Sequence, residues 1–327
     1  MPSKEKPRIK VRFWGTSGSI PTALPIQELE EKIIQALLLS KDHSLTEYEE
    51  ARQFVRTLPF LIRGTYYGNS SCVEVLNPDG PIIILDAGSG LRQAGLDIIK
   101  RPEFQKGDKT IHLFLSHLHW DHIQGFPFFT PAYFPNVTIR LYGFHPDLEK
   151  AFQNQQQDVH FPVPLQFLPA RLEFITLQPG EPLRIGSVEV QGRPQNHPGH
   201  SFAYQINISG KRFVYASDAE YQKEELDHPK PILDFFHQAD LVVFDAQYTL
   251  VENILDKMNW GHSNVLVGIE LATDAQVKKI AFTHHEPTYN DSFKEAVLNK
   301  ALEYTQLYRH GNSLEIVLAY DGLELEL

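Results

Sequence analysis

A dense group of polar side chains directly follows an apolar run in the middle of the chain. Residues 110–116 have the pattern of a buried strand, and His117, His119, Asp121 and His122 come directly after it. Because side chains alternate along an extended chain, His117 and His119 can face one centre. Asp121 and His122 can face a second centre as the chain turns. Imidazole and carboxylate groups suit zinc, manganese or iron, so the spacing predicts a metal site at the end of a strand.

Further strand-like and helical runs lie on both sides of this stretch. Strands are expected at residues 9–14, 71–76, 81–85, 201–208, 212–217, 241–244, 279–283 and 314–319. Helices are expected at residues 27–39, 44–57, 263–272 and 292–308. Ser209-Gly210 and Asp321-Gly322 indicate hairpins, and the proline-rich residues 126–168 indicate a long ordered excursion. Because strands alternate with helices in both halves, the sequence predicts an α/β sandwich in a single domain, residues 1–327.

The first two helices interrupt the strand signals, which predicts a helical insertion at residues 22–66 within the domain. One broad face of the helix at 27–39 is apolar, and we expect that face to be buried. Its residues are Leu29, Ile33, Ile34, Leu37 and Leu38. The following helix is expected to begin at Ser44, with Glu47 completing a capping box. A lid, a dimer contact and a specificity element are all compatible with such an insertion.

Charge and cysteine content exclude several classes of protein. The formal net charge is −11, from 30 basic and 41 acidic residues, which disfavours a large nucleic acid as a partner. The single cysteine, Cys72, excludes an internal disulfide and a cysteine-rich zinc finger. The first residues lack the apolar core of a signal peptide, and no apolar run is long enough to span a membrane. We therefore expect a cytoplasmic protein without membrane contact.

The spacing His-x-His-x-Asp-His at residues 117–122 resembles the signature of the metallo-β-lactamase superfamily. The resemblance implies that fold, an αββα sandwich, with later ligands at strand ends in the order His, Asp, His. His197, Asp218 and His284 have this order and these places. His200 competes with His197, and His285 competes with His284. The resemblance favours His197 and His284, because similar sequences have His-Pro at the first place and Thr-His at the second.

The same resemblance implies two divalent metal ions as cofactors, expected to be zinc, with manganese or iron as alternatives. One ion would be held by His117, His119 and His197. The other would be held by Asp121, His122 and His284, with Asp218 between the two ions. A hydroxide between the ions would be the nucleophile, because two cations lower the pKa of bound water. Asp121 is also counted among the catalytic residues.

Two further segments resemble motifs of the tRNase Z-like phosphodiesterases. They are Trp260-Gly261-His262-Ser263 and the stretch from Asp245 to Thr249 that ends an expected strand. The resemblance implies that Asp245 orients His262, which would give a proton to the leaving oxygen. Asp245 stands where that family usually has a glutamate. Asp86, at the end of another strand, is expected to orient a ligand histidine.

These features lead to one main hypothesis and three alternatives. The main hypothesis is a dinuclear metal-dependent phosphodiesterase acting on small, especially cyclic, nucleotides, because the long basic arm that grips tRNA is missing. The alternatives are a tRNA 3′-processing endonuclease of tRNase Z type, an ester, lactone or thioester hydrolase, and an iron redox protein on the same fold. The resemblance also implies a homodimer.

Overall fold

Two seven-stranded mixed sheets lie face to face at the centre of the computed structural model, which describes residues 9–78, 80–308 and 313–327. The strands of the first sheet, in spatial order, are β14 (Glu324–Glu326), β1 (Lys10–Gly15), β2 (Cys72–Leu76), β3 (Ile82–Leu85), β4 (Thr110–Phe114), β5 (Thr138–Gly143) and β6 (Arg171–Thr176). Those of the second are β13 (Glu315–Leu318), β12 (Lys279–Thr283), β11 (Leu241–Asp245), β10 (Lys211–Ala216), β9 (Ser201–Ile208), β8 (Val188–Gln195) and β7 (Leu183–Ile185).

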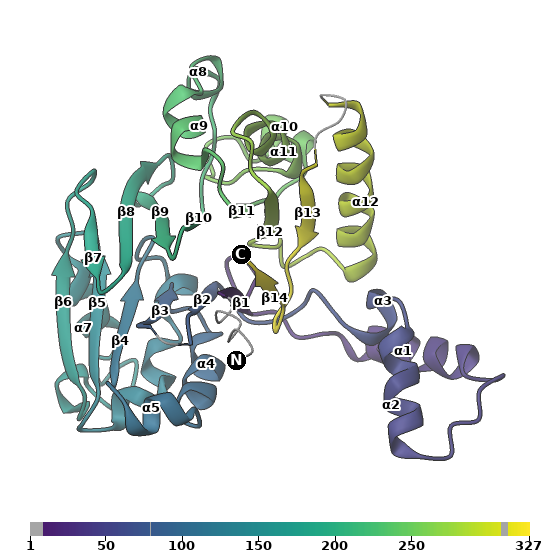
Figure 1. The fold of residues 1–327 in the computed structure, drawn as a ribbon, viewed down its shortest axis with the longest axis horizontal. Helices are drawn as coiled ribbons and strands as arrows, with labels where there is room; N and C mark the ends of the chain where they lie inside the picture. The colour runs from purple at the N-terminus through teal and green to yellow at the C-terminus, as the bar shows by residue number, and fades with distance from the viewer. Residues whose placement is uncertain (1–8, 79, 309–312) are drawn as a thin grey trace, which may run out of the picture.

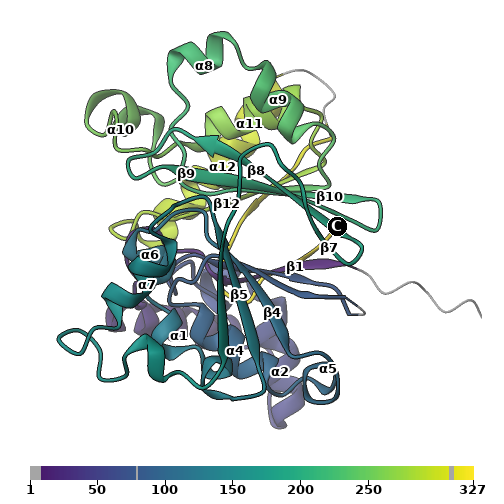
Figure 2. The same ribbon diagram turned by 90° about the vertical axis from the view of Figure 1, so that its left-hand side faces the viewer.

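Helices cover the outer faces of both sheets, as Figure 2 shows. The first sheet is covered by α4 (Leu91–Ile98), α5 (Pro102–Lys106) and α7 (Leu148–Gln155), with α6 (Trp120–Ile123) at its edge. The second is covered by α8 (Lys223–Asp227), α9 (Lys230–Phe236), α10 (Leu250–Leu255), α11 (Val265–Asp274) and α12 (Asp291–Leu307). These layers confirm the predicted αββα sandwich.

The apolar core has three layers, because each sheet is buried on both faces. Side chains from the facing sides of the sheets, such as Phe13, Phe114 and Tyr215, fill the space between them. Two further clusters join each sheet to its helices. Strands buried on both faces read as continuous apolar runs, which made β3, β4 and β11 easy to recognise, whereas β5 to β8 were not predicted.

Strand direction decides where a site can form. Strands β3 to β6 run parallel to one another, and so do β10 to β13. The loops that leave their carboxyl ends therefore gather at one edge of the sandwich, which is where ligands bind in sheets of this kind. The polar stretch after β4 and the residues after β10 and β12 all lie in such loops.

Several expectations about individual elements were wrong. Residues 126–168 are not one excursion, because they contain β5 and α7. The turn at Asp321-Gly322 joins β13 to β14, which belong to different sheets, so it makes no hairpin. The helix expected from Ser44 begins later, as α2 (Tyr48–Thr57), and Glu47 is its N-cap residue. Ser44 lies too far from the first turn to accept a hydrogen bond from its free N–H groups.

Three helices between β1 and β2 stand apart from the sheets, below α12 in Figure 1. They are α1 (Ile26–Leu39), α2 and α3 (Phe60–Arg63), and α3 contacts both α1 and α12. The expectation that the apolar face of α1 is buried was wrong, because α1 has no buried residue. The half-buried positions on its inner side are Glu28, Lys32 and Ala36, so the helix turns its polar side inward.

No helix among the described residues combines the length and the apolar character needed to cross a bilayer. Residues 1–8, which contributed to the expectation about a signal peptide, lie outside the described part of the chain.

Candidate functional site

The predicted metal-binding side chains meet at the carboxyl edge of the two sheets. Their ligand atoms form two groups, and within each group all the atoms lie within 4.8 Å of one another. The first group is His117, His119 and His197, and the second is Asp121, His122, Asp218 and His284. The loop after β4 supplies two of these residues and the following helix α6 supplies two more, whereas the loops after β8, β10 and β12 supply one each. We call these seven residues the His/Asp cluster.

Asp218 lies between the two groups. Its Oδ2 atom is 3.7 Å from His117 Nε2 and 3.3 Å from His284 Nε2. Its Oδ1 atom is 3.2 Å from His122 Nε2. Asp218 would therefore contribute to holding an ion in either group, which is the place the sequence resemblance implied for it.

The donor atoms fit a bound metal better than they fit one another. His117 Nε2 and His122 Nε2 are buried and have no hydrogen-bond partner, although carboxylate oxygens lie close to both. Buried polar atoms are rarely left unpaired, because desolvation without a partner costs about 1–3 kcal/mol. Convergent imidazole nitrogens and carboxylates suit zinc, manganese and iron in particular.

An outer layer of hydrogen bonds fixes the orientation of the cluster. Asp86, on the end of β3, accepts a hydrogen bond from His122 Nδ1 at 2.7 Å, as expected, and another from Ser116 N at 2.7 Å. The carbonyl of Gly261 lies 2.8 Å from His197 Nδ1, and Gln247 Oε1 lies 3.1 Å from His284 Nδ1. Such partners fix the tautomer and the ring orientation of ligand histidines.

Backbone conformations at the strand ends bring the cluster together. Asp86, Asp218 and His284 each follow a strand and adopt a positive φ of 60°, 51° and 61°. Non-glycine residues in this region are strained by about 1–3 kcal/mol each and gather at functional sites. Gly18 is also required, because a Cβ atom there would lie 2.6 Å from His284 Nδ1.

The two groups differ in charge state. Burial lowers the pKa values of His117 and His197, which favours neutral rings with free lone pairs. Burial also opposes charge on His284, but Asp218 and Asp121 outweigh it and raise the pKa of His284 to about 9. Despite burial, the neighbouring His122 holds the pKa of Asp218 well below its usual range. The second group therefore holds protons that a divalent cation would displace.

His262 and Asp245 form a hydrogen-bonded pair beside the cluster. His262 Nδ1 is 2.9 Å from Asp245 Oδ2, and its ring stacks on His284 with the centroids 4.9 Å apart. Asp245 is fully buried and also accepts hydrogen bonds from Ala219 N and Gln247 N, both at 3.1 Å. These contacts fix the carboxylate, which in turn leaves Nε2 as the free nitrogen of His262.

The comparison with known families decides the identity of this fold. The model of the beta-lactamase superfamily domain matches residues 82–285, well over half of the chain. The chain belongs to the beta-lactamase superfamily. Ribonuclease Z of Haloarcula marismortui is 22% identical over 321 residues, covering 80% of this chain and 96% of that protein.

Solved structures of superfamily proteins show the same fold. The metallo-beta-lactamase fold protein YhfI from Bacillus subtilis has a TM-score of 0.63 at 20% identity, covering 98% of this chain and 99% of its own. Yeast PDE1 has the same TM-score at 13% identity, with the same shares covered. The family match together with the ribonuclease Z relative makes this superfamily member a metal-dependent hydrolase.

The alternative histidines of this superfamily member lie outside the cluster. His200 is exposed and sits in the turn after His197, where its backbone N–H donates to the His197 carbonyl. His285 points away from the cluster, and its Nε2 donates to the carbonyl of Ala319 at 2.6 Å. The structure therefore brings His197 and His284 into the cluster and leaves their neighbours out.

Sequence reasoning missed three contacts that hold the cluster. Gln247 contacts His284, and the backbone N–H of Ser19 donates to Asp121 Oδ2 at 2.9 Å. Glu220 accepts from the backbone of Gly261 at 2.9 Å and so fixes the carbonyl that contacts His197. Gln247 follows Asp245 by two residues, so the strand-end pattern contained a signal for it. The sequence pattern gave no indication of the other two contacts, each of which is made by a backbone N–H group.

A cavity of about 600 Å³ adjoins His262 between α8, α10 and the start of α11. Its apolar lining consists of Tyr221, Leu226, Leu250, Ile254, Met258 and Val267. Its ionic side chains are Glu220, Lys223, Glu224 and Asp227, so acidic groups outnumber basic ones. The volume falls within the usual range for sites of small organic ligands.

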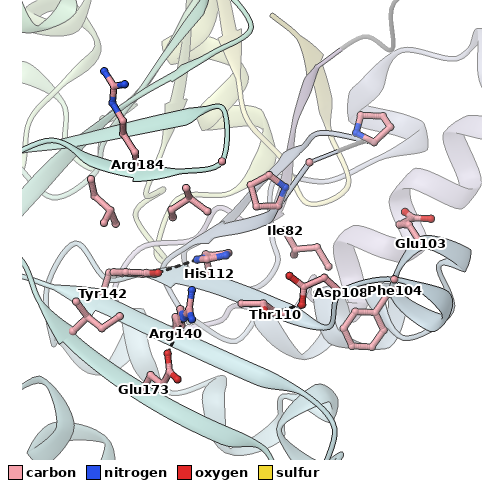
Figure 3. Close-up of a pocket in the computed structure, with 18 residues that line it drawn as sticks. Ile82, Glu103, Phe104, Asp108, Thr110, His112, Arg140, Tyr142, Glu173 and Arg184 are labelled. Carbon is pink, nitrogen blue, oxygen red and sulfur yellow. Dashed lines mark hydrogen bonds and ion pairs between the residues drawn. The ribbon is translucent and has the colours of Figure 1, made fainter.

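A larger cavity, of about 990 Å³, lies at the opposite edge of the sandwich (Figure 3). It is lined by the amino ends of β3 and β4, far along those strands from the cluster. His112 faces it, with Nδ1 2.9 Å from the Tyr142 hydroxyl, and Arg140 is paired with Glu173 at 2.7 Å. Because Arg140, Glu173 and Arg184 already form ion pairs, this cavity lacks the convergent free ligands of the cluster.

Proposed function

We propose that this chain hydrolyses phosphodiesters of small substrates, most specifically cyclic nucleotides, with two divalent ions, zinc foremost, held by the His/Asp cluster. The observation that carries the proposal is the His262–Asp245 pair at 2.9 Å beside a cluster with two groups of metal ligands. Two bound cations would supply the positive charge that a phosphodiester anion requires and would lower the pKa of water.

The protonation of the leaving oxygen is assigned to two residues of the chain. Asp245 holds His262 Nδ1, so Nε2 is free to carry a proton to the substrate. As water oxygen attacks phosphorus and the bond to the leaving oxygen breaks, that oxygen takes the proton from Nε2. An acyclic diester gives a phosphomonoester and a separate alcohol, whereas a cyclic nucleotide opens to one nucleoside monophosphate in which the leaving oxygen is a free hydroxyl. General acid catalysis of this kind contributes about 10²–10⁴-fold to rate.

The cavity beside His262 supports a small substrate. A proton donor stands next to the leaving group, so the cavity that His262 adjoins is placed to receive the leaving alcohol. The excess of acidic groups around it repels further phosphates, and the net charge of −11 acts in the same direction. A nucleoside moiety without a second phosphate meets these conditions, whereas a polynucleotide does not.

A tRNA 3′-processing nuclease is the second candidate, because ribonuclease Z of Haloarcula marismortui covers 80% of this chain. The deciding experiment compares 3′,5′-cyclic nucleotides, an aryl phosphodiester and precursor tRNA, with and without chelator. We expect metal-dependent opening of the cyclic nucleotides and little cleavage of tRNA. Cleavage of tRNA alone would establish the second candidate.

A pair of variants tests the role of His262. We expect His262→Ala to lower kcat on phosphodiesters with a poor leaving group by about 10²-fold or more, and to change the bound metal little. A p-nitrophenolate leaving group needs no proton, so the same variant should lose far less activity on it. Equal losses on both substrates would contradict the proton-donor role. Hydrolysis of esters, lactones or thioesters without phosphodiester turnover would contradict the whole proposal.

A further inference from the structure

A helix that covers a core turns its apolar side inward, whereas helix α1 turns its polar side toward the body of the protein. Its half-buried positions are Glu28, Lys32 and Ala36, spaced four residues apart on one side. Glu28 Oε1 accepts from the Tyr67 hydroxyl at 2.8 Å. Lys32 Nζ donates to the Gly64 carbonyl at 3.0 Å and pairs with the buried Asp291 at 2.8 Å. Specific polar contacts therefore hold the helix to the body.

The outward side of α1 is apolar and exposed. We call it the α1 face, which consists of Leu29, Ile33, Ile34, Leu37 and Leu38, flanked by Ile26 and Leu39. Their side chains are 41–67% exposed. Figure 1 shows that the insertion, α1 to α3, stands away from both sheets. In a monomer these apolar side chains stay in water, so they contribute no hydrophobic stabilisation.

We propose that the α1 face binds the α1 face of a second copy of this chain, antiparallel and about a two-fold axis. The first half of α1 contains Glu30 and Glu31, and its second half ends in uncharged leucines before Lys41. Parallel pairing would place these glutamates against their equivalents. Antiparallel pairing places them toward the partner's uncharged half and Lys41, which is the complementarity that a two-fold contact needs.

The exposed area matches a stable dimer. A fully exposed leucine or isoleucine offers on the order of 100 Å² of apolar surface, so the α1 face and its flanks leave about 400 Å² open. Interfaces are about 57% apolar, so this corresponds to roughly 700 Å² for each partner, near the standard value of about 800 Å². The exposed Tyr48 and Val55 of α2 add further apolar area.

A membrane surface fits the α1 face less well. Helices that lie on membranes carry Lys and Arg on their polar side, which attract anionic lipids. Helix α1 as a whole has three glutamates and one lysine, Lys32, which is already paired with Asp291. Anionic lipid would be repelled, so a second copy remains the occupant that the charges favour.

Sedimentation of the metal-loaded full chain tests the proposal. We expect a species of twice the 37.4 kDa chain mass at micromolar concentration. The double variant I33E/L37E should dissociate at least tenfold more readily, whereas V159E/F167E, which changes two even more exposed apolar residues outside α1, should remain dimeric. A monomeric wild type, or a dimer that survives I33E/L37E, would overturn the proposal. Far-ultraviolet circular dichroism checks that the variants are folded.

Single cysteines test the geometry independently. Near the two-fold axis, Ile33→Cys or Ile34→Cys should crosslink two copies under mild oxidation. Leu29→Cys alone should not, but it should crosslink when mixed with Leu38→Cys. Native Cys72 is fully buried and does not interfere. Crosslinking of Leu29→Cys with itself would overturn the antiparallel arrangement, and flotation of the protein with anionic vesicles would assign the face to a membrane. None of these measurements depends on the hydrolase activity.

Discussion

The His/Asp cluster and the α1 face differ in how much of their surroundings the chain itself provides. Six of the seven cluster side chains are buried, and Asp86, Gln247 and the Gly261 carbonyl contact them from behind. The α1 face consists of exposed side chains, and only the polar inner side of α1 contacts the body. Residues of the same chain therefore surround the cluster and leave only the metal to be supplied. The α1 face, in contrast, can be covered only by another molecule.

This contrast indicates where substitutions act. Changes at the cluster disturb contacts that already exist within one chain, so they should appear in metal binding and turnover. The most exposed positions of the α1 face, such as Leu37, have few contacts within one chain, so changes there should appear mainly in association. The experiments below separate the direct ligands, their supports, and the joint between the insertion and the body.

The largest effect is expected for Asp218→Asn. Asp218 reaches His117 and His284 in different ligand groups, so the amide removes charge from both proposed metal sites. We expect fewer than two metal ions per chain by elemental analysis and a loss of about 10³-fold in kcat/KM. Asp240→Asn is the matched control, because Asp240 is also a buried aspartate but pairs with Lys278. Full metal content in D218N would show that the ligand set is wrong.

A smaller effect on metal binding is expected for Asp86→Asn, because Asp86 orients a ligand histidine and is not itself a ligand. Asp86 Oδ2 lies 2.7 Å from His122 Nδ1, and its negative charge makes that imidazole a stronger ligand. Loss of such a partner typically weakens metal binding by about 10–100-fold. Competition with a chelator measures the change. Gln247→Leu, which removes a neutral acceptor from His284, should weaken binding less, and a reversed order would contradict this interpretation.

The His-x-His-x-Asp-His spacing predicted a metal site at the end of a strand, and the family resemblance supplied the later residues of the cluster. His117, Asp218 and His284 each follow a strand whose apolar run is plain, and parallel strands bring their ends to one edge. The 2.9 Å contact between His262 and Asp245 joins two residues whose pairing the resemblance implied, and strand positions alone do not give this distance. Contacts made by backbone atoms, such as Ser19 N with Asp121, depend on loop conformation and leave no mark in the pattern.

Helix α1 shows where the same rules fail. Its apolar periodicity predicted the helix correctly, from residues 27–39 to Ile26–Leu39, but periodicity does not say what covers the apolar side. The inward direction is set by Glu28 and Lys32, whose partners Tyr67 and Asp291 are far away in sequence. Polar anchors between distant segments are tertiary information, so the inverted orientation was not predictable.

The smallest effect is expected at the joint between the insertion and the body, where Lys294 of α12 is buried. Its amine lies 4.6 Å from the centre of the Tyr67 ring. Burial lowers its pKa to about 8, although Asp291, Glu28 and Glu286 act in the opposite direction. The folded chain therefore releases this proton at lower pH than the unfolded chain, whose lysine has a pKa of about 10.4.

The direction of the pH dependence follows from proton linkage. Below pH 8 both states are charged, and the folded state bears the full cost of the buried ammonium. As the pH rises above the folded-state pKa of about 8, the unfolded chain binds more protons, so this group costs less stability. We expect Lys294→Met to raise the free energy of unfolding at pH 7 by about 1–2 kcal/mol, because methionine carries no charge to bury. Urea titrations of both proteins between pH 7 and 10 measure this difference. It should shrink as the pH rises, and a constant difference would mean that packing, not the ammonium charge, governs this joint.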